Sequence, residues 1–275
     1  MGQARSTQRY AFKRPDLDLQ LLGRMDELRR ERPRYGYRRI WRALVREGWR
    51  VNRKRVHRLW REAGWQIYRK AKKKRRLGSS ENGCTQLRAE HRSHVWSYDF
   101  VFDRTEDGRQ LKFMPVLDEY TRECLALEVE RSITGDDVVE ILAYLFQVHG
   151  EPEFIRSDNG PEFVSKAVKK WLKESGVKTL FIEPGSPWEN AHIESFNSRL
   201  RDEFLNREIF TILTEAEVLA EQHRVYHNLD RPHSSLGYLT PAEFAALDGP
   251  QVLLPRVAGE ASDSPERGEQ VFTLS

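Results

Sequence analysis

Three acidic residues of this 275-residue chain have the types and contexts that divalent-cation chemistry requires. Asp99 lies in the run WSYDF, Asp158 in SDNGPEF and Glu194 in NAHIESFN. Carboxylates that converge from separate elements offer oxygen ligands that suit Mg²⁺, which binds few protein groups and keeps positions for waters and phosphate oxygens. Two such ions roughly 3.5 to 4 Å apart would stabilise the attacking and the leaving oxygen of an in-line phosphoryl displacement. This set of residues therefore points to phosphoryl transfer.

The two aspartates are expected on or next to strands. Residues 95–102 have the pattern of a strand, in which Asp99 faces away from Tyr98. An acid in that position is costly to bury unless it is paired or bound to metal. Asp158 follows directly after a short expected strand at 153–157, and open α/β sheets bind ligands at the carboxyl ends of their strands.

Glu194 is expected on a long helix, residues 189–207. Counting in threes and fours from Glu194 gives a polar stripe that continues through Asn197, Ser198 and Arg201, beside an apolar stripe of Ile193, Phe196, Leu200 and Phe204. The helix therefore rests on the core and presents Glu194 at its edge. Spacing alone does not identify the site, because Asp and Glu fill 42 of the 275 positions.

The order of the expected elements indicates the fold class. Three strands come first, and strands then alternate with helices, which predicts an α/β fold with a mixed sheet, an antiparallel meander plus parallel strands, flanked by helices. The expected strands are 95–102, 111–117, 124–129, 153–157 and 178–182, and the expected helices are 136–149, 165–175, 189–207 and 215–228. Cys84 and Cys124 are too few for a disulfide framework, and we expect Cys124 to be buried in its strand.

The first 76 residues differ from the rest in charge. They carry 26 Lys/Arg and 7 Asp/Glu, a net charge of +19, whereas residues 77–275 carry a net charge of −15. Three helices are expected here, at 17–32, up to Gly48 and from Asn52 to Gly64, and this predicts an all-α helix-turn-helix domain that binds nucleic acid. The alternative is an ordinary three-helix bundle with a solvated last helix. The basic residues expected to contact DNA are Arg38, Arg39, Arg53, Lys54, Arg55, Arg58 and Arg61.

Composition divides the chain further. We expect the helix-turn-helix domain at 1–76, a linker at 77–93, a catalytic core with a C-terminal helical extension at 94–247, and a flexible tail at 248–275. The basic run 69–76 is either a charged linker or a segment that follows a DNA backbone. No stretch reaches the roughly 18 apolar residues of a membrane helix and no signal region follows Met1, so we expect a cytosolic protein that does not bind a membrane.

Several stretches resemble the DDE transposase and retroviral integrase superfamily, whose catalytic core is ribonuclease H-like. The resemblance is greatest to the second-reading-frame transposases that bacterial insertion sequences make by frameshift fusion. It covers residues from about 20 to 247, and 35 residues lie between Asp158 and Glu194, which is the spacing of the family. The matching stretches are YGYRRIWRALVREGWRVNRKRVHRLWREAG, WSYDF, SDNGPEF, PGSPWENAHIESFNSRLRDEF and YHNLDRPHSSLGYLTPAEF.

The resemblance implies a function and its residues. Asp99, Asp158 and Glu194 would hold two Mg²⁺ or Mn²⁺ ions and catalyse hydrolysis of a phosphodiester, followed by attack of the freed 3′-hydroxyl on another strand. Asn197 and Arg201 would contact DNA; the family often has lysine at the latter position, and an arginine favours bidentate phosphate contact. The expected partners are double-stranded DNA at the element ends and target, further copies of the chain, and an upstream-frame polypeptide, in the bacterial cytoplasm at the nucleoid.

Two other functions remain open: a ribonuclease H-like nuclease that does not join strands, and a DNA-binding regulator with an inactive core. Other candidate residues are given structural interpretations. Asp103, Asp118 and Glu119 fit strand ends and turns, and His91 and His94 lack the cysteine pair of a zinc module. For His223, His227 and His233 we expect structural or DNA-facing roles.

Overall fold

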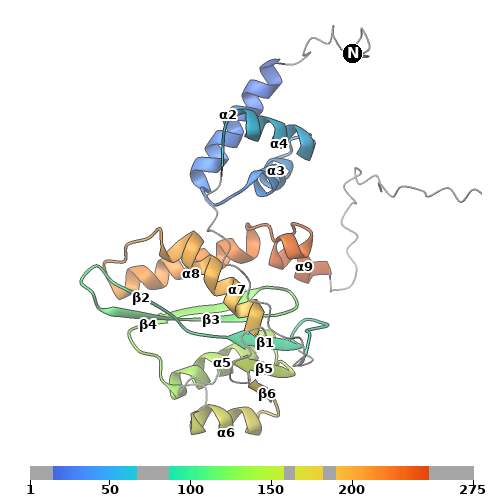
Figure 1. The fold of residues 1–275 in the computed structure, drawn as a ribbon. Helices are drawn as coiled ribbons and strands as arrows, with labels where there is room; N and C mark the ends of the chain where they lie inside the picture. The colour runs from blue at the N-terminus through green and yellow to red at the C-terminus, as the bar shows by residue number, and fades with distance from the viewer. Residues whose placement is uncertain (1–14, 67–86, 158–164, 182–189, 248–275) are drawn as a thin grey trace, which may run out of the picture.

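The structure is a computed structural model that describes residues 15–66, 87–157, 165–181 and 190–247. A helical domain lies at one end of the molecule, and a sheet with helices on both faces forms the rest (Figure 1). Asp158, Cys84, the basic run 69–76 and the tail 248–275 lie outside the described residues. None of the described helices is long and apolar enough to cross a membrane.

Over residues 15–66 the N-terminal domain has the three expected helices: α2 (Pro15–Glu31), α3 (Tyr37–Arg46) and α4 (Arg53–Glu62). The side chain of Asn52 caps α4 by accepting a hydrogen bond of 2.8 Å from the backbone N–H of Lys54. The apolar faces of the three helices meet in one core, which contains Leu21, Met25, Leu28, Tyr35, Ile40, Leu44, Val56, Leu59 and Trp60. The helix-turn-helix prediction therefore matches this domain.

The sheet is mixed, as predicted. Its strands are β1 (Val95–Tyr98), β2 (Val101–Arg104), β3 (Gln110–Asp118), β4 (Cys124–Glu130), β5 (Phe154–Ser157) and β6 (Lys178–Phe181). The central strand β3 pairs antiparallel with β1 and β2 and also with β4, while β1, β5 and β6 run parallel to one another. Cys124 is fully buried at the start of β4, in agreement with the expectation from its strand.

The first strand is interrupted at Asp99. A single strand over 95–102 was expected, but the ladder breaks between β1 and β2. Both halves pair with β3 in one continuous register, which puts Pro115 opposite Asp99. Proline has no N–H to donate to a ladder. The backbone N–H of Phe100 is bound by Asp99 Oδ1 at 2.8 Å, so the aspartate side chain provides an acceptor within the break.

Helices cover the two faces of the sheet (Figure 1). The helices α5 (Gly135–His149) and α6 (Lys166–Glu174) pack on the face that presents Trp96 and Tyr98. On the other face lie α7 (Ala191–Leu200), the π-helical turn η2 (Arg201–Leu205) and α8 (Leu213–Leu229), followed by a short 3₁₀ turn, Ser234–Leu236, and α9 (Pro241–Leu247). The long helix expected over 189–207 is thus an α-helix that changes to a π-turn at Arg201.

Three histidines lie between the catalytic-core helices on this second face. The buried His227 packs edge-on against Phe196 of α7, with ring centroids 4.9 Å apart, and also contacts His233. His223 stacks on Phe204 of η2 at 4.8 Å. Burial lowers the pKa of His223 to about 4 and lowers the pKa values of His227 and His233 as well. These rings are therefore neutral at neutral pH and contact neighbouring groups of the protein, which supports the structural one of the two roles that we expect for them.

Because the pKa of His223 is lowered in the folded protein, we expect the protein to lose stability in mild acid. Between pH 6.5 and pH 4 the unfolded chain binds a proton at His223 that the folded protein does not, so the free energy of unfolding falls as the pH falls, by at most about 1.4 kcal/mol per pH unit for this group. In His223→Gln this contribution is absent. Urea unfolding at pH 7, 6 and 5 should show a shallower pH dependence in His223→Gln than in the wild type, with the exposed His91→Gln as control. Parallel curves for His223→Gln and the wild type would contradict this interpretation.

Candidate active site

Asp99 is held at the break in the first strand by two hydrogen bonds. Its Oδ1 accepts the N–H of Phe100, and its Oδ2 accepts the side-chain amide of Asn197, with Nδ2 and Oδ2 2.9 Å apart. An ionised carboxylate only accepts hydrogen bonds, so the amide nitrogen of Asn197 has to face it. The bond ties the helix α7 to the strand that carries Asp99.

The helix α7 presents its polar stripe to the same strand. Glu194 is exposed in the first turn of α7, one turn before Asn197. Further along, the Arg201 guanidinium donates to the backbone carbonyl of Phe102 on β2, with a distance of 2.7 Å. The neighbouring side of the helix is anchored by the buried Ile193, Phe196 and Leu200. The stripe predicted from spacing therefore faces the strand of Asp99.

The strand β5 ends directly before Asp158, the third candidate acid. β5 lies beside β1 in parallel, with Arg156 paired to Ser97, and it ends at Ser157, the residue before Asp158. The Arg156 guanidinium donates to both carboxylate oxygens of Glu119, at 3.1 and 2.9 Å, in a buried ion pair. Burial raises the pKa of Glu119 to about 7, although the charge of Arg156 opposes this shift. The end of β5 is thus anchored two residues before Asp158.

The described donors fit Mg²⁺. Asp99 and Glu194 supply carboxylate oxygens, which are hard ligands of the kind that Mg²⁺ prefers. In addition, Asn197 Oδ1 is buried beside Asp99 and has no hydrogen-bond partner in the described part of the chain. This carbonyl oxygen is a further neutral donor at the same place.

The basic residues of α4 fall into two groups. Arg53, Lys54 and Arg61 are exposed to solvent. Arg55 and Arg58 reach back to α2, where they donate to the two carboxylate oxygens of Asp18 at 2.6 Å each. The exposed group is available to a polyanion, and the other group also holds the domain together.

Two predicted DNA contacts, Arg38 and Arg39, extend toward the catalytic core. Arg38 donates to the hydroxyl of Tyr238 at 3.5 Å, and Arg39 donates to Glu203 at 3.0 Å. Glu203 is also bound by the buried Arg231. Glu203 and Arg231 are not among the residues predicted from the sequence, because neither belongs to a pattern that distinguishes it from the other charged residues of its segment.

The residues given structural interpretations have structural partners. The buried carboxylate of Asp118 accepts backbone N–H groups of Ser93, Tyr120 and Thr121 at 2.7 to 2.9 Å, which fixes the turn between β3 and β4. The rings of His91 and His94 stack, and their ligand atoms lie within 4.8 Å of one another and of a carboxylate oxygen of Glu153. However, His94 Nδ1 accepts the N–H of Glu90, which leaves the proton of the neutral ring on Nε2 and disfavours metal binding there.

The contact between Asn197 and Asp99 predicts how a new carboxylate would respond to a divalent ion. Asn197→Asp places a second negative charge against Asp99, so the variant should melt a few degrees below the wild type without divalent ions. Mg²⁺ should raise the melting temperature of Asn197→Asp more than that of the wild type, because binding to the folded state stabilises it. Gln222→Glu, which adds a carboxylate on α8, is the control for thermal denaturation with and without Mg²⁺. Equal Mg²⁺ responses in Asn197→Asp and Gln222→Glu would contradict the metal assignment.

Comparison with protein families gives three matches along the chain. Models of an integrase core domain match residues 89–187 and 175–241, and a model of an HTH-like domain matches residues 16–74. Among solved structures, the HTLV-2 integrase catalytic core domain in complex with magnesium is similar with a TM-score of 0.47 and 14% identity, over 57% of this chain and 99% of that chain.

Proteins of bacterial insertion elements are similar over most of their length. The 31.7 kDa protein of insertion element IS407 from Burkholderia multivorans is 40% identical over 247 residues, which cover 90% of this chain and 88% of the relative. The 39.2 kDa protein of IS476 from Xanthomonas euvesicatoria is 38% identical, over 89% of this chain and 70% of the relative. A putative transposase, InsK of IS150 from Escherichia coli, is 29% identical, over 90% and 89%. The chain therefore belongs to the insertion-sequence transposases of the DDE transposase and integrase superfamily, which join an HTH-like domain to an integrase core.

Proposed function

We propose that this protein is a metal-dependent transposase that cuts DNA and joins the cut strand to a target, with Asp99, Asp158 and Glu194 as its catalytic residues. The observation that carries the proposal is the hydrogen bond from Asn197 to Asp99, because it holds the helix of Glu194 against the strand of Asp99. The third acid follows a strand that lies directly beside that of Asp99. Three carboxylates from three adjacent elements are what a site for two divalent ions needs.

The three acids and Arg201 have different roles in the proposed reaction. Asp99, Asp158 and Glu194 would hold Mg²⁺ or Mn²⁺, which supplies charge neutralisation for the attacking and leaving oxygens when bound. Arg201, whose guanidinium is anchored on the carbonyl of Phe102, would hold a phosphate of the terminal DNA next to the acids. Water would first attack the phosphodiester and break its P–O3′ bond, which leaves a 3′-hydroxyl and a 5′-phosphate. This hydroxyl would then attack a phosphodiester of the target strand and displace the 3′-oxygen of that strand, so no bond between protein and DNA forms.

The N-terminal domain would bring the DNA end to this site. The exposed Arg53, Lys54 and Arg61 lie on α4, the last helix of the domain, which is the element that enters the major groove in helix-turn-helix proteins. Their contacts with phosphates would make binding strongly dependent on salt concentration. Two element ends must be handled together, so we expect at least two copies of the chain on the DNA, with an upstream-frame polypeptide as a further partner.

The prediction that tests this proposal concerns Glu194. Glu194→Gln keeps the size and the exposed position of the side chain but removes the charge, so cleavage and joining should both fall by at least about 100-fold, while DNA affinity stays within about threefold. The measurement uses supercoiled plasmid and labelled duplex with Mg²⁺ or Mn²⁺, and it scores nicking and strand joining separately. Glu208→Gln, an exposed acid after η2, is the matched control and should behave like the wild type.

Each other outcome identifies a different function. Nicking that depends on Glu194 without any joined product would indicate a nuclease of the same fold. DNA binding without nicking, also after the upstream polypeptide is added, would indicate a regulator with an inactive core.

A further inference from the structure

The catalytic helix has two polar sides, and only one of them faces the candidate site. Asn197 and Arg201 bind the first strand, and Glu194 lies one turn before Asn197 on the same side of the helix. Glu203 follows nine residues after Glu194, which at about 100° per residue is half a turn further round the axis. It lies in the π-turn η2, whose N–H of Asn206 reaches back five residues to the carbonyl of Arg201 at 2.9 Å. Glu203 therefore points away from the acids, toward the N-terminal domain.

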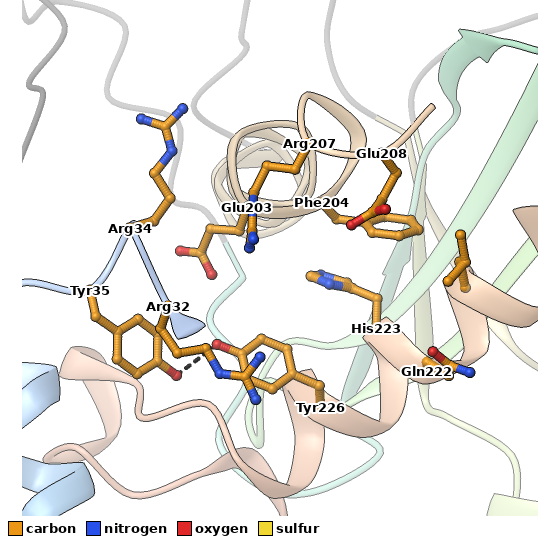
Figure 2. A pocket seen from close by; sticks show the side chains of 11 residues that line it. Arg32, Arg34, Tyr35, Glu203, Phe204, Arg207, Glu208, Gln222, His223 and Tyr226 are labelled. Atoms are coloured by element: carbon orange, nitrogen blue, oxygen red, sulfur yellow. Dashed lines mark hydrogen bonds between the residues drawn. The ribbon is translucent and has the colours of Figure 1, made fainter. Parts of the chain in front are cut away.

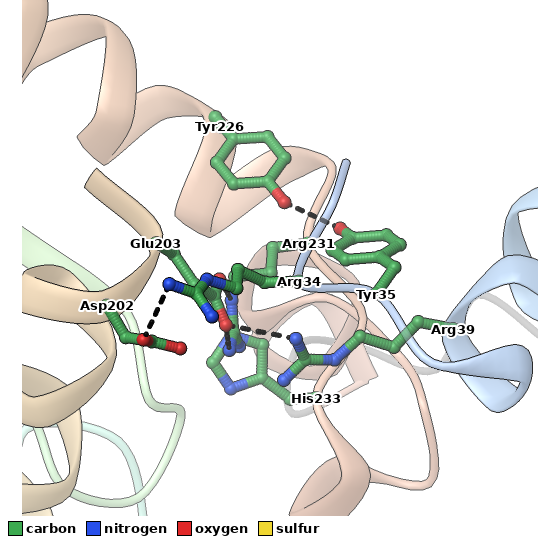
Figure 3. Close-up of polar contacts among 8 residues, drawn as sticks. All are labelled: Arg34, Tyr35, Arg39, Asp202, Glu203, Tyr226, Arg231 and His233. Atoms are coloured by element: carbon green, nitrogen blue, oxygen red, sulfur yellow. Dashed lines mark hydrogen bonds and ion pairs between the residues drawn. The ribbon is translucent and has the colours of Figure 1, made fainter. Parts of the chain in front are cut away.

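Glu203 joins the two domains through a buried charge cluster (Figure 3). Within the core, Arg231 donates to its two carboxylate oxygens at 2.6 and 2.7 Å, and the Arg231 side chain is only 1% exposed. From α3 of the N-terminal domain, Arg39 donates to the same carboxylate at 3.0 Å. Desolvation of the carboxylate raises its pKa, but hydrogen bonds and charge from Arg231 and Arg39 outweigh this and lower the pKa of Glu203 to about 2. The carboxylate is thus charged throughout the neutral range.

Further polar contacts surround this ion pair. Tyr226 of α8 donates through its hydroxyl to the hydroxyl of the buried Tyr35, with the two oxygens 2.7 Å apart. Arg34 pairs with Asp202, the neighbour of Glu203, at 3.3 Å. The N-terminal domain is therefore bound to two successive residues of η2, which continues directly from the helix of Glu194.

Polar and charged side chains also line a space beside these contacts. A pocket of about 190 Å³ opens between the loop that joins α2 to α3, the η2 segment and α8, and it is lined mostly by polar and charged side chains, including Arg32, Arg207 and Gln222 (Figure 2). From the described part of the core, Tyr226 packs against the apolar cluster of the N-terminal domain. The ion pairs and the tyrosine pair consequently determine where the domain lies. Removal of one partner of a buried ion pair is strongly destabilising, since it leaves the other charge uncompensated.

We propose that Glu203 is a positioning residue: it fixes the DNA-binding domain relative to the catalytic helix and so determines which phosphodiester, counted from the bound DNA sequence, is cut. The consequence for cleavage rests on the proposed function. The docking of the domain does not, because it follows from the contacts between the two domains, those of Glu203, Asp202 and Tyr226 among them. The N-terminal domain contributes Arg39, Arg34 and Tyr35 to these contacts, and Arg46 of α3 adds a hydrogen bond to the backbone carbonyl of Asp230 and an ion pair with Glu243.

The first test measures docking without any catalytic activity. Spin labels are placed at Leu19→Cys on α2 and Val218→Cys on α8, two exposed positions, in the full chain with Cys84→Ser. Cys124 stays in place, because it is buried and burial raises the pKa of its thiol. The wild type should give one narrow distance distribution without DNA, and Glu203→Gln should broaden it, through a roughly tenfold or larger fall in the ratio of docked to undocked protein.

A second variant covers the case in which Glu203→Gln unfolds. Tyr226→Phe removes only the hydroxyl that donates to Tyr35 and should broaden the distribution less, while Tyr144→Phe on the exposed face of α5 should leave it unchanged. A broad distribution in the wild type, or one as narrow in both Glu203→Gln and Tyr226→Phe as in the wild type, would overturn the proposal.

The second test maps the cut on labelled duplex that carries an element end. Wild type should cut at one phosphodiester, whereas Glu203→Gln and Tyr226→Phe should spread the cuts over neighbouring positions at unchanged DNA affinity. A merely structural role would lower all cleavage and leave its position the same, and this result would overturn the positioning role. Absence of metal-dependent cutting by the wild type would count against the proposed function, and the distance measurement would then decide the docking on its own.

Discussion

The hydrogen bond between Asn197 and Asp99 is the contact on which the site depends. It exists because the first strand of the sheet breaks at Asp99, where the facing position of β3 is Pro115 and the carboxylate binds the next backbone N–H itself. In an unbroken ladder Asp99 would be one more alternating side chain on the sheet. At the break Asp99 contacts α7, so a hydrogen bond connects the strand of Asp99 to the helix of Glu194 and makes them one rigid unit.

The π-turn that follows α7 gives this unit a second function. A helix held on one side by the first strand and on the other by Glu203 has little freedom to tilt, because the buried Phe196 and Leu200 also pack on the sheet. π-Turns inside helices are frequent at functional sites. Here the turn begins at Arg201, so one short segment carries both the predicted DNA contact and the residues that bind the N-terminal domain.

Much of this architecture could be predicted from the sequence. The helical periodicity of 17–64 and the order of strands and helices after Val95 predicted the two folds, because buried faces repeat with the period of their element. The polar stripe from Glu194 to Arg201 was predicted for the same reason, and the structure turns it toward Asp99. Asp158 lies outside the described residues, so its place in the site stays a prediction.

Two features could not be predicted, for physical reasons. The break at Asp99 depends on Pro115, which is a neighbour only after the strands have paired. The second feature is the cluster of ion pairs around Glu203. Arg39 is a basic residue at a position where a DNA contact is expected, and only the fold shows that Glu203 and Arg231 lie beside it. Local patterns contain no information about partners more than a hundred residues away. The sequence therefore predicts a DNA contact for Arg39 and does not predict its ion pair with Glu203.

The central claim is that the carboxylates of Asp99, Asp158 and Glu194 together bind divalent ions. Anomalous diffraction from crystals of the protein with Mn²⁺ tests it most directly, because the signal locates each ion without reference to activity. We expect anomalous peaks between Asp99 and Glu194, and their loss in Glu194→Gln. Peaks only elsewhere, for instance beside His91 and Glu153, or none at all at saturating Mn²⁺, would contradict it.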